Sequence, residues 1–242
     1  MNFATFAIPR RVTAFASIVI AGLFHPNVSQ AAVLVTYDIA AANAAVDSTL
    51  TPTAASGITA GDLSLTGVTP VSISGSFAAT GWGVDPTPDL GKYIEFTVTP
   101  TTGNQITFGT LDGTFWRAAG NPVATFHAAD KFELRSSADS FGSTIGSVAD
   151  LLHTGDAVQT ALSFDLSSLG TRSQGTTFRL YGYNEANPFN AGLGNSVSLD
   201  GTGGNLFLNG TVSPVPEPYS IALVTAFGLF GFGLIRRRTP RR

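Results

Sequence analysis

The stretch from Tyr93 to Pro100, Tyr-Ile-Glu-Phe-Thr-Val-Thr-Pro, decides the fold class of this 242-residue chain. Its apolar residues Ile94, Phe96 and Val98 alternate with more polar neighbours. Successive side chains of a strand point to opposite faces of a sheet, so a period of two predicts a strand with one buried and one solvated face. A helix would need apolar residues at every third or fourth position. The stretch therefore predicts a strand of an antiparallel sheet.

The same period of two recurs through most of the chain, in short runs rich in Thr, Val and Phe. Gly, Pro, Asn or Asp separates these runs, which predicts about ten strands joined by turns. The further runs are 33–39, 106–108, 132–134, 178–180, 197–199 and 206–208. Residues 40–60 lack the pattern and predict a loop or an irregular edge. Many short strands without helices predict an all-β domain, an antiparallel two-sheet sandwich of the jelly-roll type.

The beginning of the chain differs from this middle part. Arg10 and Arg11 precede the apolar run 12–24, and Ser29-Gln30-Ala31 then offers small residues at the positions that a signal peptidase recognises. A basic segment, a short apolar run and a small-x-small site are typical of a secretory signal peptide. Residues 1–31 are therefore predicted to be a signal peptide, cleaved after Ala31.

The end of the chain differs as well. The tetrapeptide Val215-Pro216-Glu217-Pro218 precedes the uncharged apolar run 219–235 and the cluster Arg236-Arg237-Arg238. A helix of this length is about 25 Å long, at the short end of what spans a bilayer. Arginines after such a helix hold the C-terminus on the cytoplasmic side. We therefore expect a sandwich domain over 32–213 and a tail over 214–242 with a transmembrane helix at 219–235.

The order of these elements resembles the PEP-CTERM sorting signal of Gram-negative bacteria. The resemblance covers 215–242 and implies recognition by exosortase, a membrane protease or transpeptidase, at Pro216-Glu217-Pro218. It implies an exported protein, anchored transiently in the inner membrane and then placed at the cell surface or in the extracellular matrix. Phrases such as Phe178-Arg179-Leu180-Tyr181-Gly182-Tyr183 also resemble exported bacterial β-sandwich modules. Relatives often have Asp-Asn before the last strand, whereas Gly201 follows Asp200 here.

Removal of both ends changes the charge of the protein. Six basic and fifteen acidic residues lie between 32 and 214, a formal charge of −9 compared with −3 for the whole chain. Such a surface repels nucleic acid, which excludes DNA or RNA as a partner. The chain has no cysteine, which also excludes a Cys nucleophile and a thiolate metal site.

Few residues indicate catalysis. The chain has no Gly-x-Ser-x-Gly serine elbow, and His127 and His153 stand 26 residues apart without a metal-ligand spacing. Glu95 and Glu133 lie on the polar faces of their predicted strands. They leave open one enzymatic alternative, a polysaccharide-active hydrolase or lyase, which needs two carboxylates within about 5–10 Å of each other in a cleft.

Two kinds of ligand site remain open. A calcium site would use carboxylates in turns, although Asp is also an ordinary turn residue. The candidate residues are Asp85, Asp89, Asp112 and Asp200. A carbohydrate site would use flat aromatic side chains, although outward aromatics also stabilise a sheet by themselves. The candidates are Trp82, Trp116, Tyr181 and Tyr183, with Arg179 on the same predicted face as the two tyrosines.

These observations favour a non-enzymatic exported β-sandwich with a structural or adhesive role, including weak carbohydrate binding. Its expected partners are signal peptidase and exosortase during export, and extracellular polysaccharide afterwards. No cofactor is required by this hypothesis, and calcium is the one ion that the turn carboxylates would suit.

Overall fold

The computed structural model describes residues 31–42, 49–72, 75–117, 129, 131–148, 158–183, 191–194 and 204–216. Within these residues the chain forms sixteen β-strands and three single-turn 3-10 helices, which confirms the all-β class. The number of strands exceeds the prediction of about ten because several strands span only two or three residues, too few for an alternating pattern. The predicted strand at 197–199 lies outside the described residues.

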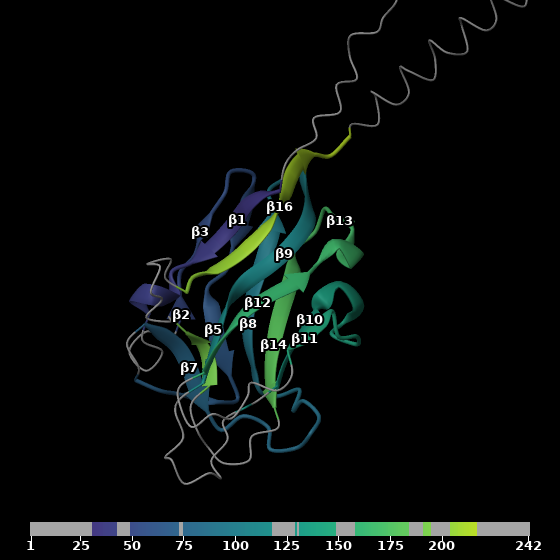
Figure 1. Cartoon of the computed structure of the whole chain (residues 1–242). Helices are drawn as coiled ribbons and strands as arrows, with labels where there is room; N and C mark the ends of the chain where they lie inside the picture. The colour runs from purple at the N-terminus through teal and green to yellow at the C-terminus, as the bar shows by residue number, and fades with distance from the viewer. Residues whose placement is uncertain are drawn as a thin grey trace, which may run out of the picture.

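The larger of the two sheets has nine strands, and every pair in it is antiparallel. These strands are β1 (Ala32–Tyr37), β3 (Thr53–Ala54), β6 (Thr69–Pro70), β7 (Ser76–Thr80), β9 (Asn104–Arg117), β12 (Val158–Asp165), β13 (Thr171–Arg172), β15 (Ala191–Gly194) and β16 (Leu206–Pro214). Their order is β3-β1-β16-β9-β15-β7-β6, and β12 and β13 also pair with β9. The long strand β9 is therefore the centre of this large sheet (Figure 1).

The smaller sheet has seven strands and is also antiparallel throughout. These strands are β2 (Thr49–Leu50), β4 (Ile58–Ala60), β5 (Leu63–Thr66), β8 (Tyr93–Pro100), β10 (Lys131–Ser136), β11 (Gly146–Val148) and β14 (Thr176–Tyr183). Their order is β11-β10-β14-β8-β5-β2, and β4 also pairs with β8. The stretch that decided the fold class is thus a full strand, β8, in the interior of this small sheet.

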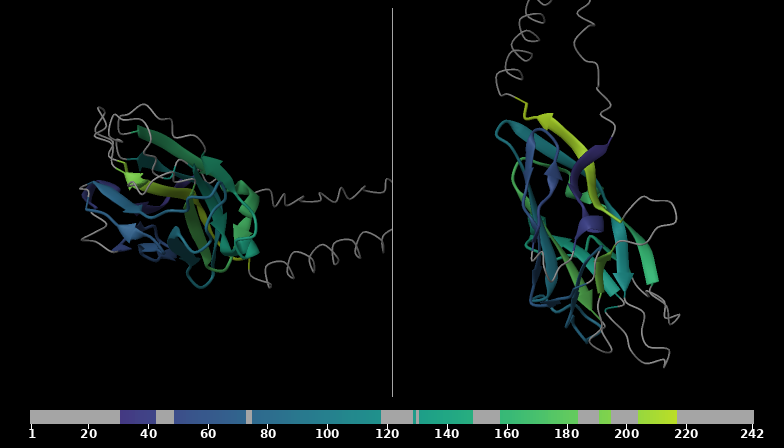
Figure 2. Two further views of the ribbon diagram at one scale, coloured as in Figure 1. Left: turned by 90° about the horizontal axis from the view of Figure 1, so that it is seen from below. Right: turned by 90° about the vertical axis from the view of Figure 1, so that its left-hand side faces the viewer.

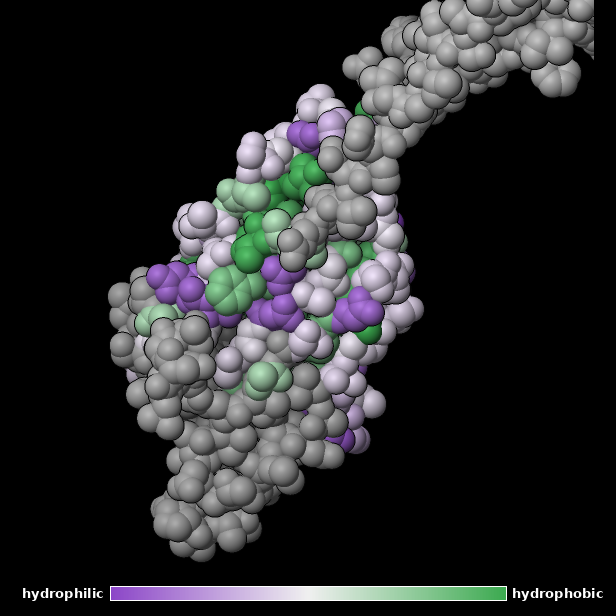
Figure 3. Space-filling view, turned by 45° about the horizontal axis from the view of Figure 1, so that its top comes forward, coloured by the Kyte–Doolittle hydropathy of each residue, from purple (hydrophilic) through white to green (hydrophobic). Residues whose placement is uncertain are grey.

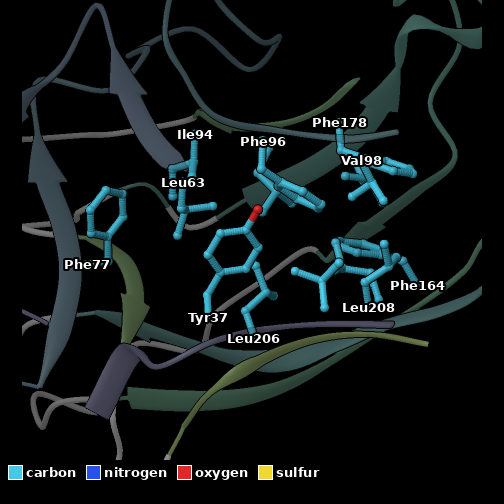
Figure 4. Packing of buried hydrophobic residues seen from close by; sticks show 14 of the residues in the cluster. Tyr37, Leu63, Phe77, Ile94, Phe96, Val98, Phe164, Phe178, Leu206 and Leu208 are labelled. Carbon is cyan, nitrogen blue, oxygen red and sulfur yellow. The ribbon is translucent and has the colours of Figure 1, made fainter. Parts of the chain in front are cut away.

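The two sheets enclose one hydrophobic core between them. Tyr37 of β1 meets Phe96 of β8 edge-on, with 5.5 Å between ring centroids. Phe115 of β9 stacks on Phe132 of β10 at 4.0 Å. Each contact joins the large sheet to the small sheet, and all four rings are at most 1 % exposed. Figure 4 shows Tyr37 pointing across the core toward Phe96. Because each buried aromatic side chain contributes about 1.5–3 kcal/mol, this interface dominates the stability of the domain.

Short 3-10 helices connect some of the strands. They are η1 (Ile39–Ala41), η2 (Ser137–Asp139) and η3 (Ser167–Leu169). The stretch 40–60, predicted as a loop or irregular edge, contains η1 and the short strands β2, β3 and β4 where it is described. None of the described helices is long and apolar enough to cross a membrane.

The first and last strands are neighbours in the large sheet. Ala32 of β1 pairs with Gly210 of β16, and β16 continues to Pro214. The first and last described residues therefore lie at the same end of the sandwich, here called the terminal end (Figures 1 and 2). Asn104 pairs with Pro214 at this end. Because β8 runs toward Asn104, its first residue Tyr93 lies at the opposite end, here called the distal end.

Candidate functional site

Several residues that the sequence singled out meet on the outer side of the small sheet. Arg179 of β14 lies between Glu95 of β8 and Arg135 of β10 in the register of the strands. Tyr181 lies opposite Glu133. We call this surface the arginine–aromatic face, and it comprises Tyr93, Glu95, Glu133, Arg135, Phe141, Arg179 and Tyr181. The alternation correctly predicted that these residues of β8, β10 and β14 lie on the side of their strands that faces away from the core, and the strand pairing brings them together.

The charges on the arginine–aromatic face are paired. Arg135 donates its Nε–H to Glu133 Oε1 at 2.5 Å, and Arg179 donates its Nε–H to Glu95 Oε2 at 2.6 Å. The Glu133 side chain is 8 % exposed and the Arg135 side chain 17 %. A buried carboxylate is stable in its charged form only with such a partner. Both glutamates therefore serve as counter-charges for arginines within the sheet.

Aromatic rings complete the same face. The guanidinium of Arg179 lies 4.2 Å from the ring centroid of Tyr93 and 4.0 Å from that of Phe141. Arg135 lies 5.6 Å from the centroid of the Tyr181 ring, and Tyr93 meets Tyr181 edge-on at 5.7 Å. Cations over ring faces at these distances are attracted by the ring quadrupole. The arginines are thus held by rings as well as by carboxylates.

This packing corrects the expectation that Tyr181 and Tyr183 form an open stacking surface for sugar rings. Both lie on the outer face as predicted, but Tyr181 is 1 % exposed and Tyr183 is 9 % exposed. Arg135 and Tyr93 pack against Tyr181, while Gly83 lies beside the Cβ of Tyr183. A ring that protein atoms cover cannot stack on a sugar.

The pKa shifts of this face follow from its contacts. Burial lowers the pKa of Arg179, but hydrogen bonds to Glu95 and Tyr181 and the charge of Glu95 raise it more, so that it lies above its ordinary value. Burial raises the pKa of the Tyr181 hydroxyl, against the opposing effect of Arg179. At neutral pH both groups therefore keep their protons, which suits a structural network.

Phe141 reaches this face from the loop after η2, and the sequence pattern did not predict its role. Ser140 and Phe141 both have φ of 61°, the left-handed region that non-glycine residues rarely occupy. The Phe141 carbonyl accepts a hydrogen bond from Arg135 Nη1 at 3.0 Å, and its N–H donates to the Ser136 carbonyl at 2.9 Å. The arginines therefore fix this loop in its strained conformation.

Trp82 is a core residue, which corrects its assignment as a sugar-stacking candidate. It is 1 % exposed, its indole N–H donates to the Ala79 carbonyl at 3.0 Å, and its ring meets Phe132 edge-on at 5.7 Å between centroids. A Cβ added to Gly182 would come within 2.7 Å of the Trp82 ring. Glycine at position 182 thus makes room for the indole. The side chain of Trp116 lies outside the described part of the structure.

The two glutamates proposed as a catalytic pair stand apart. Glu95 and Glu133 lie on strands two positions apart, about 9.6 Å, and are offset by two residues along the strands, about 6.8 Å. Their backbone positions are therefore about 12 Å apart. Arg179 and Tyr181 occupy the strand between them. This arrangement does not support the hydrolase hypothesis, which needs the two carboxylates within about 5–10 Å of each other in a cleft.

Asp112 lies in a hydrogen-bond network on the outer side of the large sheet. Its carboxylate accepts hydrogen bonds from Thr110, Ser163 and Asn209, each at 2.6 Å. Asp112 therefore ties β9, β12 and β16 together.

The outer surface of the molecule also carries exposed apolar side chains. Figure 3 shows hydrophobic and hydrophilic surface side by side on the visible face of the molecule. Exposed Val33 lies opposite Asn209 in the large sheet.

The remaining calcium candidates do not gather around Asp112. Asp85 and Asp89 are both exposed in the loop before β8, where Asp89 accepts a hydrogen bond from the Gly91 N–H at 2.9 Å and lies 3.9 Å from Lys92. Asp200 lies outside the described residues. Within the described ranges no three acidic or histidine side chains come together in a way that could hold a metal ion.

Most of the predicted processing residues are also outside the described part of the chain. Ser29 precedes it, and Glu217, Pro218 and the helix 219–235 with Arg236, Arg237 and Arg238 follow it. Ala31 directly precedes β1, and Val215 and Pro216 directly follow β16. The Val215 N–H donates to the Gly103 carbonyl at 2.8 Å. The predicted sorting motif thus begins where the last strand ends.

Comparisons with known proteins add little. No protein-family model matches this sequence. The search of curated proteins gave no match either. Among solved structures, the chain is similar to the K3 cleaved adhesin domain of Lys-gingipain from Porphyromonas gingivalis, with 12 % identity and a TM-score of 0.31. That similarity covers 66 % of this chain and 93 % of the adhesin domain.

Proposed function

We propose that this protein is an exported, non-enzymatic β-sandwich that is displayed at the cell surface or in the extracellular matrix, where it has a structural or adhesive role. The observation that carries the proposal is the position of the chain ends. The first and last strands are antiparallel neighbours, and both ends leave from the terminal end of the sandwich. A tail attached at this end would hold the domain with its distal end facing outward.

The bounds of the strands support the proposed processing. The first strand begins at Ala32, one residue after the predicted signal-peptide cleavage site at Ala31. The last strand ends at Pro214, immediately before Val215-Pro216-Glu217-Pro218. Cleavage at both sites would remove no strand. In this proposal exosortase recognises the Pro-Glu-Pro motif after the helix 219–235 has inserted into the inner membrane.

The contacts of the acidic residues on the outer faces of the two sheets support the proposed role without catalysis. Glu95 and Glu133 are each paired with an arginine, and Asp112 is occupied by three hydrogen-bond donors. Carboxylates in such contacts hold neighbouring strands together. The chain also crosses repeatedly between the two sheets along its length, a trait that favours the jelly-roll type within this proposal.

Mass spectrometry of the protein recovered from its host tests the processing. The expected N-terminus is Ala32, and the expected C-terminus lies within or next to Pro216-Glu217-Pro218. A matched variant, Glu217→Ala, should remain in the membrane fraction with the tail intact, whereas Glu95→Ala should be processed normally. Recovery of a chain that runs from Met1 to Arg242 would overturn the proposed sorting.

A further inference from the structure

A hollow of about 340 Å³ opens at the edge of the sandwich. One wall is formed by η2 and the loop after it, which connect β10 to β11 of the small sheet, and the other by η3 and β13, which follow β12 of the large sheet. The two single-turn helices near β13 and β10 in Figure 1 mark these walls. We call this site the edge hollow, lined among others by Asp139, Ser143, Thr144, Ser168, Leu169 and Arg172. Its volume lies at the lower end of the range of small-ligand pockets.

Arg172 brings a positive charge to the edge hollow. The other two arginines whose side chains the structure describes, Arg135 and Arg179, are each paired with a glutamate. No ion pair or hydrogen bond joins the Arg172 side chain to any described residue. A guanidinium presents several N–H donors in a fixed plane and binds carboxylates with two parallel hydrogen bonds. Arg172 is therefore free to take an anionic group from outside the chain.

Asp139 brings a negative charge to the same hollow. A hydrogen bond from the Ser143 side chain and further ones from the backbone N–H groups of Ser143 and Gly142 lower the pKa of Asp139 below its ordinary value. This carboxylate is therefore ionised at neutral pH and can accept hydrogen bonds from ligand hydroxyls. The Thr144 and Ser168 hydroxyls can each donate and accept, and the Ser143 hydroxyl, which donates to Asp139, can still accept.

The rim of the hollow is held in shape before any ligand arrives. Phe141 fixes the η2 loop through its contacts with Arg179 and Arg135. The Ile145 N–H donates to the Leu134 carbonyl at 2.8 Å, and Ser137 Oγ accepts from the Thr177 N–H at 2.9 Å. Strained, over-determined backbone is typical of ligand sites because it fixes the binding groups in advance. The arginine–aromatic face thus supports the edge hollow.

We propose that the edge hollow binds a hexuronic acid residue, a sugar ring that carries one carboxylate. The Arg172 guanidinium takes the carboxylate, while Asp139 and the three hydroxyl side chains take the ring hydroxyls. Leu169 and Ile145, which pack against the hydrophobic core, offer an apolar wall to the C–H face of the ring. The proposal deepens the adhesive part of the proposed function by naming its ligand class.

Charge selects this ligand over simpler ones. Ionised Asp139 repels a dianion such as phosphate. A monoanion with hydroxyl groups can instead place its carboxylate at Arg172 and a hydroxyl at Asp139. A neutral sugar leaves the guanidinium of Arg172 without an acceptor. Because the domain carries a formal charge of −9, it repels a continuous polyuronate chain. The suitable form is therefore a single uronate at a chain end or side branch.

Saturation-transfer NMR on the whole protein as recovered from cells tests this inference. The matched probes are methyl β-D-glucuronide and methyl β-D-glucoside, which differ only in the carboxylate at C6. The glucuronide is expected to bind at least tenfold more tightly, and Arg172→Gln should remove that preference. Lys131→Gln makes the same change in charge at the distal end of the small sheet and should leave the preference intact.

One further variant and three further probes test whether the sugar binds in the edge hollow and whether the whole uronate is recognised. Ser168→Trp fills the hollow from its rim and should abolish binding of both sugars, with the melting temperature as a check on folding. Equal affinity for the two sugars, a preference that survives Arg172→Gln, or tighter binding of acetate, phosphate or glycine than of the glucuronide would each overturn the proposal. The assay does not depend on where the tail is cut, so its failure leaves the proposed sorting untouched.

Discussion

Substitution of Arg179 by Gln measures what the arginine–aromatic face contributes to stability. The variant loses the ion pair with Glu95, whose two side chains are 26 % and 29 % exposed. A pair with this much solvent contact contributes about 0.5–1 kcal/mol. The variant also loses the contacts of the guanidinium with the rings of Tyr93 and Phe141, each about 0.5–1 kcal/mol. We therefore expect the free energy of unfolding to fall by about 2 kcal/mol.

Urea denaturation of the variant and of the original protein provides the measurement. For a domain of this size, a loss of 2 kcal/mol also lowers Tm by about 4–8 °C. Lys131→Gln is the control, because it removes one positive charge from the same sheet outside the network, and it should change stability by less than about 0.5 kcal/mol.

A double-mutant cycle separates the ion pair from the ring contacts. Glu95→Gln alone should cost about 0.5–1 kcal/mol, and adding it to Arg179→Gln should cost little more, because the pair is already broken. If Arg179→Gln destabilised the domain no more than Lys131→Gln does, the packing of Arg179 between the two rings would contribute nothing, and the reasoning would be wrong.

Three further variants test other parts of the structure. Thr176→Val should raise stability by about 1 kcal/mol in urea denaturation, because the buried Thr176 hydroxyl has no hydrogen-bond partner among the described residues; a loss would reveal a partner. Gly182→Ala should cost about 1–3 kcal/mol, since its Cβ would meet the Trp82 ring at 2.7 Å; a neutral effect would show that the indole can shift. Ser143→Ala should return the lowered pKa of Asp139 toward 3.8 in an NMR titration. The stability linked to this carboxylate is present above pH 3.8 and is lost as the pH falls through the lowered pKa, so an unchanged titration would remove Ser143 as the cause.

The alternation in the sequence predicted the strands and the direction of their side chains because it depends on local geometry alone. In β14, Phe178 and Leu180 face the core while Arg179 and Tyr181 face outward, as the period of two required. The burial of Tyr181 could not be predicted in the same way. It depends on Arg135, which lies on another strand and is brought beside Tyr181 by pairing.

The residues that sequence reasoning missed lie where the backbone is irregular. Trp82 follows β7 and turns into the core after Gly81, whose φ of 84° breaks the strand pattern. Phe141 adopts a left-handed conformation that no local preference of phenylalanine favours. The walls of the edge hollow come from segments about 30 residues apart in sequence, which only the packing of the two sheets brings together.

The antiparallel pairing of β16 has a mechanical consequence for a protein held by its C-terminus. The strand β16 is hydrogen-bonded to β1 on one side and to β9 on the other, and it runs directly into the tail. Arg172, Ile106 and Val212 occupy one row across the large sheet. Because β13 pairs with β9 and the tail continues from β16, tension between a ligand at Arg172 and the tail would have to pass through the β9–β16 ladder, whose pairs extend from Asn104–Pro214 to Asp112–Phe207.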